Sequence, residues 1–532
     1  MSDHETDVLI IGAGATGAGV MRDLALRGIA SLLIDRRDLN AGASGGNHGL
    51  LHSGGRYAAT DTATAAECRI EGEILKRVAP QCIDDCGGLF VAVEGDDPDF
   101  AARFPAACAA AGIACEALTP DEARAREPAL PQTLIAAYAV PDATIDPFRL
   151  VLENVAHAEA LGLGRYLPHT AVEGFETDAG RIVAAQARDL RTGAPFRIAV
   201  REVVNAGGTW AGRIAALAGC DEVRLLGSKG TLIIANTRIA KGVINRLRPP
   251  GDGDILVPGG TVSILGTSSV TLRDPDDAAA RAPTAAEVDR ILDEGSAMLP
   301  VLAETRFVRA FSGVRPLLLS DAAEEDGRKA SRGFTLYDHE GQGLANFCTI
   351  VGGKLTTFRL MAEKTADLVA ARLGVVAPCR TATEPLPSGP GLGWTAPGAS
   401  ARDWMARADA TDTILCECEM VARSAVDEIV ARAPGHEDHM SLDAIARRSR
   451  IGKGACQGAF CSMRVTSHLY DAGVYEGAEG LGEMRRFIDG RYRGVRPVLW
   501  GAGLAQTELA EILHVGLAGL DLLNDDAPED PR

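Results

Sequence analysis

The chain has 532 residues, of which 46% are apolar and 24% charged, so it can bury a large core and is not a disordered or fibrous protein. Its 54 Lys and Arg residues against 72 Asp and Glu residues give a net charge of -18, which argues against a nucleic-acid-binding surface. An anionic ligand would therefore need a local cluster of basic side chains.

The N-terminal segment Met1–Asp7 is acidic, and the apolar run that follows it stops at Gly12. We therefore expect no secretion signal, and no later run reaches the ~18 apolar residues that a membrane-spanning helix needs. Eight of the 12 cysteines are scattered along the chain, a pattern that favours reduced, structural thiols. The expected location is the cytoplasm, with at most peripheral contact with a membrane.

The first 35 residues have the pattern of a strand, a turn, a helix and a second strand. An apolar run leads to a glycine-rich turn, the amphipathic segment Ala15–Arg27 predicts the helix, and Ala30–Ile34 predicts the second strand. This is a βαβ unit.

The turn of this unit has the spacing G-x-G-x-x-G, formed by Gly12, Gly14 and Gly17. Such a turn lets a pyrophosphate approach the backbone at the positive N-terminus of the helix. Asp35 ends the second strand about 20 residues later, where a carboxylate can accept hydrogen bonds from ribose hydroxyls. A structural tight turn is the weaker interpretation, and the unit predicts a dinucleotide site.

Three further glycine-rich segments favour FAD over NAD, namely Ala41–Arg56, Val203–Trp210 and Ile350–Phe358. Small residues let the chain pass close to a flavin. The first of these segments leads directly to His52, Arg56 and Tyr57, which are therefore expected near the flavin. Any one of these segments could be an ordinary loop, but their combination after a dinucleotide turn predicts a flavoprotein.

Short apolar runs alternate with Ala-rich helical stretches, such as Thr62–Ala79 and Pro283–Met298, as far as about residue 380. This alternation predicts an α/β fold. Pro, Gly, Ser and Thr then dominate from about 378 to 400, which indicates a linker. We expect four regions: an FAD-dependent oxidoreductase unit at 1–380, a linker at 381–408, a cysteine-containing module at 409–470, and a helical segment at 471–532.

The remaining four cysteines form two pairs that are separated by 37 residues, Cys416 with Cys418 and Cys456 with Cys461. Four thiolates are the usual ligands of a [2Fe–2S] cluster, and nearby glycines could present backbone N–H groups to its sulfurs. Structural zinc is the main alternative, but the single residue between the first two cysteines fits zinc poorly. Free or vestigial thiols are a third interpretation.

These motifs resemble those of the catalytic subunits of anaerobic glycerol-3-phosphate dehydrogenases, and the resemblance extends over nearly the whole chain. The segments that carry it are IIGAGATGAGVMRDLALRG, GNHGLLHSGGRYA, PDATIDPFRL, DILVPGG, SGVRPL, TIVGGKLTTFRLMAEK, CECEMV and GKGACQGAFC. The resemblance implies a D-amino-acid-oxidase-like fold, in which a Rossmann-type FAD domain and a substrate domain interleave, followed by a [2Fe–2S] module like bacterioferritin-associated ferredoxin. It also implies membrane-associated companion proteins for electron transfer, a quinone acceptor and a place on the cytoplasmic face of the inner membrane.

The implied reaction oxidises sn-glycerol 3-phosphate to dihydroxyacetone phosphate by hydride transfer to FAD. Arg56, Arg315 and Arg332 are then expected to bind the phosphate, because arginine forms paired charge-assisted hydrogen bonds with phosphate oxygens. Lys354 is expected beside the flavin, where a positive charge stabilises the reduced anion. Tyr57 completes the expected catalytic set.

The identity of the general base stays open. Related aerobic enzymes carry a histidine in the segment matching Ser228–Leu232, which here is SKGTL, and an acid after the segment that here is GTSS (Gly266–Ser269). His52 is the first candidate for the general base, and Lys354 or a bound water is the next. Packing against the flavin is an equally good alternative role for His52.

The expected FAD contacts come from all of these glycine-rich segments. They are Gly12, Ala13, Gly14, Ala15, Thr16, Gly17, Asp35, Arg36, Ser44, His48, Gly49, Leu51, His52, Ala206, Gly207, Trp210, Gly353, Lys354, Leu355 and Thr356.

Two other functions remain open at this point. A flavin dehydrogenase of the same class could act on another polyol phosphate, a 2-hydroxy acid or an imino acid. A non-catalytic redox sensor could also keep FAD and the cluster without turnover, but it would not need the arginine and lysine motifs.

Overall fold

The computed structural model describes residues 4–319, 333–387, 404–432 and 440–522. The predicted βαβ unit is confirmed: β1 (His4–Ile11) and β2 (Ser31–Ile34) are parallel neighbours joined by α1 (Ala15–Leu26). The last four residues of β1, Val8–Ile11, are buried, because their side chains enter hydrophobic cores on both faces of this parallel strand. Their continuous apolar run follows from that burial.

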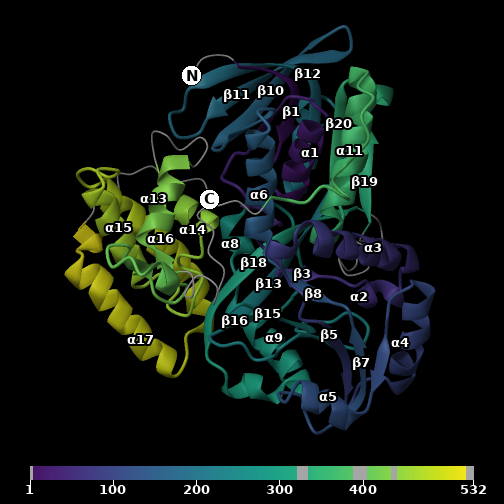
Figure 1. Ribbon diagram of the computed structural model, residues 1–532, viewed down its shortest axis with the longest axis vertical. Coiled ribbons are helices and arrows are strands. Elements are labelled where there is room, and N and C mark those ends of the chain that lie inside the picture. The colour runs from purple at the N-terminus through teal and green to yellow at the C-terminus, as the bar shows by residue number, and fades with distance from the viewer. Residues whose placement is uncertain (1–3, 320–332, 388–403, 433–439, 523–532) are drawn as a thin grey trace.

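The first sheet lies at the top of Figure 1 and has the order β10-β11-β12-β1-β2-β9, with β20 paired to β12 and β19 paired to β20. Three helices that are distant in sequence lie together on it, because α1 packs against both α6 (Pro147–Ala160) and α11 (Phe358–Leu373). The remaining strands are β9 (Gly164–Leu167), β10 (Thr170–Asp178), β11 (Arg181–Asp189), β12 (Pro195–Asn205), β19 (Phe334–Asp338) and β20 (Phe347–Gly352).

The second sheet lies below the first in Figure 1 and has the order β17-β13-β16-β15-β14-β5-β7-β6, with β18 paired to β13. Helix α9 (Ala285–Met298) packs on it and confirms the predicted helix in this region. The strands are β5 (Gly88–Val93), β6 (Glu116–Leu118), β7 (Leu134–Val140), β13 (Leu225–Ala235), β14 (Val243–Arg246), β15 (Ile255–Gly259), β16 (Val262–Gly266), β17 (Val270–Leu272) and β18 (Phe307–Leu318). The chain alternates between the two sheets several times.

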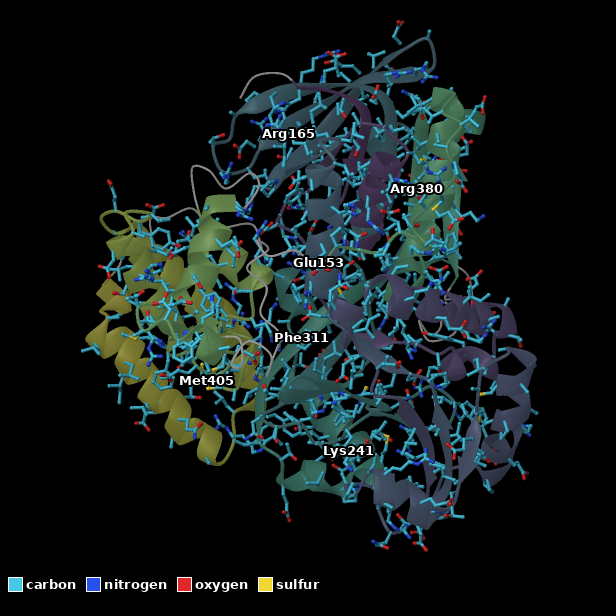
Figure 2. The ribbon with its side chains drawn as sticks, viewed as in Figure 1. Glu153, Arg165, Lys241, Phe311, Arg380 and Met405 are labelled. Carbon is cyan, nitrogen blue, oxygen red and sulfur yellow. The ribbon has the colours of Figure 1, made fainter. Side chains whose placement is uncertain are left out.

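Smaller elements connect these sheets. A short third sheet contains β3 (Leu50–Leu51), β4 (Ile83–Asp84) and β8 (Ala143–Ile145). The other helices of this part are α2 (Gly55–Ala58), α3 (Thr62–Val78), α4 (Pro98–Ala110), α5 (Pro120–Arg126), α7 (Ala211–Leu217) and α8 (Ala278–Arg281). Glu153 of α6 is a buried carboxylate that lies near the middle of the molecule (Figure 2). It accepts hydrogen bonds from the side chains of Arg149 and Gln81.

The C-terminal part forms a helical unit beside both sheets, on the left of Figure 1. One hydrophobic core holds it together, with residues from Leu415 to Leu520. Its elements are β21 (Ile414–Cys416), β22 (Val421–Ala422), α13 (Arg423–Arg432), α14 (Leu442–Arg448), α15 (Cys461–Asp471), α16 (Glu479–Val495) and α17 (Ala502–Glu511). Among the described residues, none of the helices combines the length and apolar character needed to cross a membrane.

Candidate active site

The glycine turn after β1 is built by backbone contacts that no larger residue allows. Gly12 has a φ of 112°, and a Cβ at this position would lie 2.4 Å from the Ala206 carbonyl oxygen. Gly14 precedes α1 as its N-cap without a side-chain cap, while Ser44 Oγ accepts from Ala15 N at 2.9 Å. The turn therefore brings the helix N-terminus to the protein interior as a site for a pyrophosphate.

Asp35 lies where the dinucleotide motif requires an acid. Its two carboxylate oxygens accept from Ala13 N and from Arg37 N, each at 2.8 Å. Carboxylate oxygens have further lone pairs, so both can still accept hydrogen bonds from ribose hydroxyls. The Arg37 guanidinium stacks over the Trp210 ring at 5.1 Å from its centroid, and burial lowers the pKa of Arg37 to about 10.

One large cavity of about 1350 Å³ joins the glycine turn to the second sheet. This volume exceeds the ~300–1,000 Å³ of most small-molecule pockets and suits a dinucleotide together with a substrate. The expected residues that line it are Gly12, Gly14, Ala15, Thr16, Asp35, Arg36, Ser44, His48, His52, Arg56, Tyr57, Ala206, Gly207, Trp210, Arg315, Gly353, Lys354 and Leu355.

Five of the expected contacts are not on the cavity wall and support it from behind: Ala13, Gly17, Gly49, Leu51 and Thr356. Leu51 belongs to the hydrophobic core, and Thr356 Oγ1 accepts from the backbone N–H of His52 at 3.2 Å. Arg332 lies outside the described residues.

Three expected catalytic side chains come together at the cavity. The rings of His52 and Tyr57 have centroids 5.3 Å apart, and Lys354 Nζ lies 4.8 Å from the centroid of the Tyr57 ring. The two segments that carry them, residues 50–57 and 354–358, are joined by the hydrogen bond from His52 to Thr356 across 304 sequence positions. Two distant parts of the sequence thus form one polar wall.

The two described arginines of the expected set have different surroundings. Arg56 donates to Asp254 Oδ2 at 2.5 Å and to the Arg246 carbonyl at 3.1 Å, so it forms a buried ion pair. Arg315, on β18, donates to Thr267 Oγ1 at 2.5 Å and to the Ser268 carbonyl at 3.4 Å. These contacts place the Arg315 guanidinium beside the loop of Thr267 and Ser268 on the cavity wall.

His48 lies close enough to both arginines for their charges to act on it. Burial, together with the positive charges of Arg315 and Arg56, lowers the pKa of His48 to about 3. The ring is therefore neutral at physiological pH, and its Nδ1 accepts from Leu50 N at 3.3 Å.

The four clustered cysteines converge from two segments of the helical unit. Hydrogen bonding with Cys461 lowers the pKa of Cys416, and hydrogen bonding with Cys418 and Cys461 lowers that of Cys456 to about 2. A Cβ at Gly454 would lie 2.5 Å from Cys418 Cβ, so this glycine lets the segments meet. Within the described residues, however, no group of three or more His, Cys, Asp or Glu side chains has an arrangement that could hold a single metal ion.

The cavity also contains residues that the sequence analysis did not select. Thr267 and Ser269 line its wall beside Arg315, and Asn47 and Arg37 lie on the loops after β2. The segment GTSS was considered only for its likeness to related enzymes. Its position directly after a buried apolar strand, with three hydroxyl side chains in succession, is the signal that could have identified it.

Comparison with known proteins agrees with this geometry. Residues 7–368 match the family described as FAD dependent oxidoreductase. The chain is 41% identical to one subunit of the anaerobic glycerol-3-phosphate dehydrogenase of Escherichia coli, over 98% of this chain and 99% of that protein. The protein of the same name from Haemophilus influenzae is 38% identical, over 100% of this chain and 96% of its own length. The structure of a glycerol-3-phosphate dehydrogenase from Bacillus halodurans complexed with FAD has a TM-score of 0.66 at 22% identity, covers 94% of this chain and 97% of its own, and shares the fold.

Proposed function

Because this chain belongs to the FAD-dependent oxidoreductases and, within them, to the anaerobic glycerol-3-phosphate dehydrogenase family, we propose that it oxidises sn-glycerol 3-phosphate to dihydroxyacetone phosphate. One observation carries the proposal. A single cavity contains both a glycine turn of the dinucleotide-binding type and an arginine hydrogen-bonded to a threonine hydroxyl. This combination suits a flavin and a phosphorylated alcohol side by side.

The residues of the turn and of the loops after it fit FAD. The backbone N–H groups at the start of α1 suit its pyrophosphate, Asp35 suits its ribose, and left-handed glycines at 352 and 353 let the backbone pass close to a ring system. When bound, FAD accepts the hydride that leaves C2 of the substrate.

The chain's own groups then bind the substrate and move one proton. Arg315 binds the phosphate, and Arg56, which its ion pair with Asp254 holds on the cavity wall, lies beside it as a second basic side chain. His52 takes the proton of the C2 hydroxyl as that hydride departs, with a bound water as the alternative base. Lys354, held over Tyr57, supplies positive charge near the flavin.

The single residue between Cys416 and Cys418 supports an iron–sulfur cluster over zinc at the four cysteines. Their thiols are within hydrogen-bonding reach of one another, and backbone N–H groups of the adjacent loops also act on the Cys416 and Cys456 thiols. A [2Fe–2S] cluster here would supply one-electron transfer towards membrane-associated companion proteins and a quinone, with the protein peripheral on the cytoplasmic face of the membrane.

Anaerobic titration of the purified flavoprotein tests the substrate assignment. Glycerol 3-phosphate should bleach the flavin absorbance, and Arg315→Ala should raise the required concentration strongly while the flavin stays bound. If a 2-hydroxy acid or an imino acid bleaches the flavin and glycerol 3-phosphate does not, the assignment is wrong.

Cys456→Ser tests the cluster separately. The wild type should contain iron and acid-labile sulfide with visible and paramagnetic signals, and the variant should lose them but keep substrate reduction of the flavin. Zinc in place of iron in the wild type would contradict the cluster.

A further inference from the structure

The guanidinium of Arg315 lies flat against the neighbouring strand because that strand has a glycine beneath it. Strands β13 and β18 pair with Ser228 opposite Arg315, so these two side chains project from the same face. A Cβ at Gly230, two residues along β13, would lie 2.2 Å from Arg315 Nη2. The glycine therefore provides the space in which the guanidinium lies.

Hydroxyl side chains of the loop after β16 line the cavity near this guanidinium. Thr267 Oγ1 accepts from Arg315 Nη2 at 2.5 Å, and Ser269 Oγ lies 3.2 Å from Ser228 Oγ behind it. Thr267 and Ser269 both line the cavity. A hydroxyl that accepts from arginine keeps its own hydrogen, which it can donate to another oxygen.

A buried charge network holds the loop that carries these hydroxyls. Ser268, between them, donates through Oγ to Glu287 Oε1 at 2.9 Å and accepts from Thr231 N at 3.0 Å. Lys229 Nζ donates to Glu287 Oε2 at 2.9 Å, with 4% and 9% of the two side chains exposed. Burial opposes the charge of Glu287, but hydrogen bonds from Lys229 and Ser268 outweigh it and lower the pKa of the carboxyl.

We propose that Thr267 and Ser269 complete a subsite for a phosphate monoester with Arg315, and that Glu287 is the positioning residue beneath it. A phosphate dianion offers more acceptor sites than a carboxylate, and it matches a guanidinium with one hydroxyl group bonded to it and a second nearby on the cavity wall. The inference rests on the proposed function and refines it, because this subsite would select phosphorylated alcohols over hydroxy acids and imino acids.

Kinetics of Thr267→Val and Ser269→Ala, measured with an artificial electron acceptor, test the subsite. Each variant should raise the KM for glycerol 3-phosphate about tenfold to a hundredfold, because a hydrogen bond to a charged group is lost. The kcat should stay within about twofold, because neither residue takes part in the proposed proton transfer. Thr271→Val, an exposed hydroxyl on the adjacent strand β17, is the matched control and should leave both constants unchanged.

Inorganic phosphate provides a second probe that does not depend on turnover. It should perturb the flavin spectrum of the FAD-bound wild type and compete with substrate, and Thr267→Val should weaken its binding in parallel with the KM. An unchanged KM in both hydroxyl variants, or no binding of phosphate to the wild type, would overturn the subsite. If phosphate binds through Thr267 but glycerol 3-phosphate fails to reduce the flavin, the proposed function falls and the subsite stands.

Glu287→Gln tests the positioning role. The variant should raise the KM for glycerol 3-phosphate and the inhibition constant of phosphate about tenfold, while the kcat stays close to that of the wild type. The melting temperature should fall, because the buried Lys229 loses its charged partner. A fall in melting temperature with an unchanged KM would instead assign Glu287 a purely structural role. If the variant does not fold, the two hydroxyl variants still decide the subsite.

Discussion

His48 shows how the cavity controls the charge of a single residue. It is half-buried on the cavity wall, and its burial together with the charges of Arg315 and Arg56 opposes its protonation. A neutral imidazole here adds no positive charge to the wall and can accept a hydrogen bond. The arginines are therefore left as the cations that face an anionic ligand from this part of the wall.

The depressed pKa of His48 makes the stability depend on pH. The folded value is about 3 and the ordinary value is 6.5, so the unfolded chain binds more protons between these limits. The stabilisation is present above about pH 6.5 and is lost as the pH falls towards 3, by about 1.4 kcal/mol per pH unit. His48→Gln should flatten this part of the curve of unfolding free energy against pH, measured by denaturant titration. Above pH 7 the two curves should run parallel, and a flattened slope there would contradict the assignment.

The sequence located many of the residues on the cavity wall but not what they touch. Gly12, Asp35 and Lys354 stand in short motifs whose local geometry defines their position, so pattern alone places them correctly. The ion pair of Arg56 with Asp254 joins residues 198 positions apart, and no local pattern predicts it. Thr267 was missed because its role depends on the pairing of two distant strands.

At the level of elements, the loop after β2 reaches the second sheet through two facing glycines. A Cβ at Gly313, on β18, would lie 1.9 Å from the carbonyl oxygen of Gly46, and one at Gly46 would lie 2.7 Å from Gly313 Cα. Both residues line the cavity. The approach of these backbones therefore sets how close the dinucleotide turn lies to Arg315, two residues further along β18.

Gly313→Ala should consequently push the loop after β2 away from β18 and weaken FAD binding. The methyl group would overlap a backbone oxygen, which cannot move as a flexible side chain would, and residues 42–49 would have to shift. The ratio of flavin to protein after purification measures the effect, and we expect it to fall severalfold. Gly259→Ala on β15 is the matched control, because its nearest neighbour would be 3.7 Å away. Equal flavin content in both variants would show that the glycine contact is not needed.

A helix or strand could be predicted from the sequence where a regular spacing of apolar residues lies within that one segment. The βαβ unit and the helices at α3 and α9 follow from apolar spacing and from caps such as the Thr284 and Glu287 capping box. The order of the strands was not predictable, since β13 pairs with β18 across about 80 residues and β5 pairs with β14 across about 150. Such pairings are decided by the packing of the whole sheet.

For the whole molecule, the main question is how the helical unit is fixed to the oxidoreductase part. Arg448 on α14 donates to both carboxylate oxygens of Asp38 at 2.6 and 2.9 Å, and Arg450 forms a second ion pair with Asp146 at 3.2 Å. Lys453 lies 4.0 Å from the centroid of the Phe148 ring. These contacts hold residues 448–453 of the helical unit against α6 and the loop after β2.

Asp38 and Arg448 are the most buried of these partners, with 1% and 3% of their side chains exposed. Tyr166 and the backbone of Leu39 also donate to Asp38, so its charge is solvated by protein groups. Arg448→Met removes the nearer of the two arginines that pair with this buried carboxylate and leaves Arg447 at 3.8 Å. The loss of a buried ion-pair partner typically costs about 3–5 kcal/mol, and the more distant Arg447 offsets part of that cost. That cost falls on the interface and not on either hydrophobic core.

Arg448→Met should therefore loosen the helical unit before it unfolds the oxidoreductase part. Limited proteolysis should cut the variant within the linker predicted at 381–408 faster than the wild type, while bound flavin and its reduction by substrate persist. The double variant Asp38→Asn with Arg448→Met should regain much of the protection, because no buried charge of this pair then lacks its partner. If Arg448→Met loses flavin at the same denaturant concentration at which it loses the helical unit, the two parts unfold as one cooperative structure. The ion pair would then contribute to global stability and not specifically to docking.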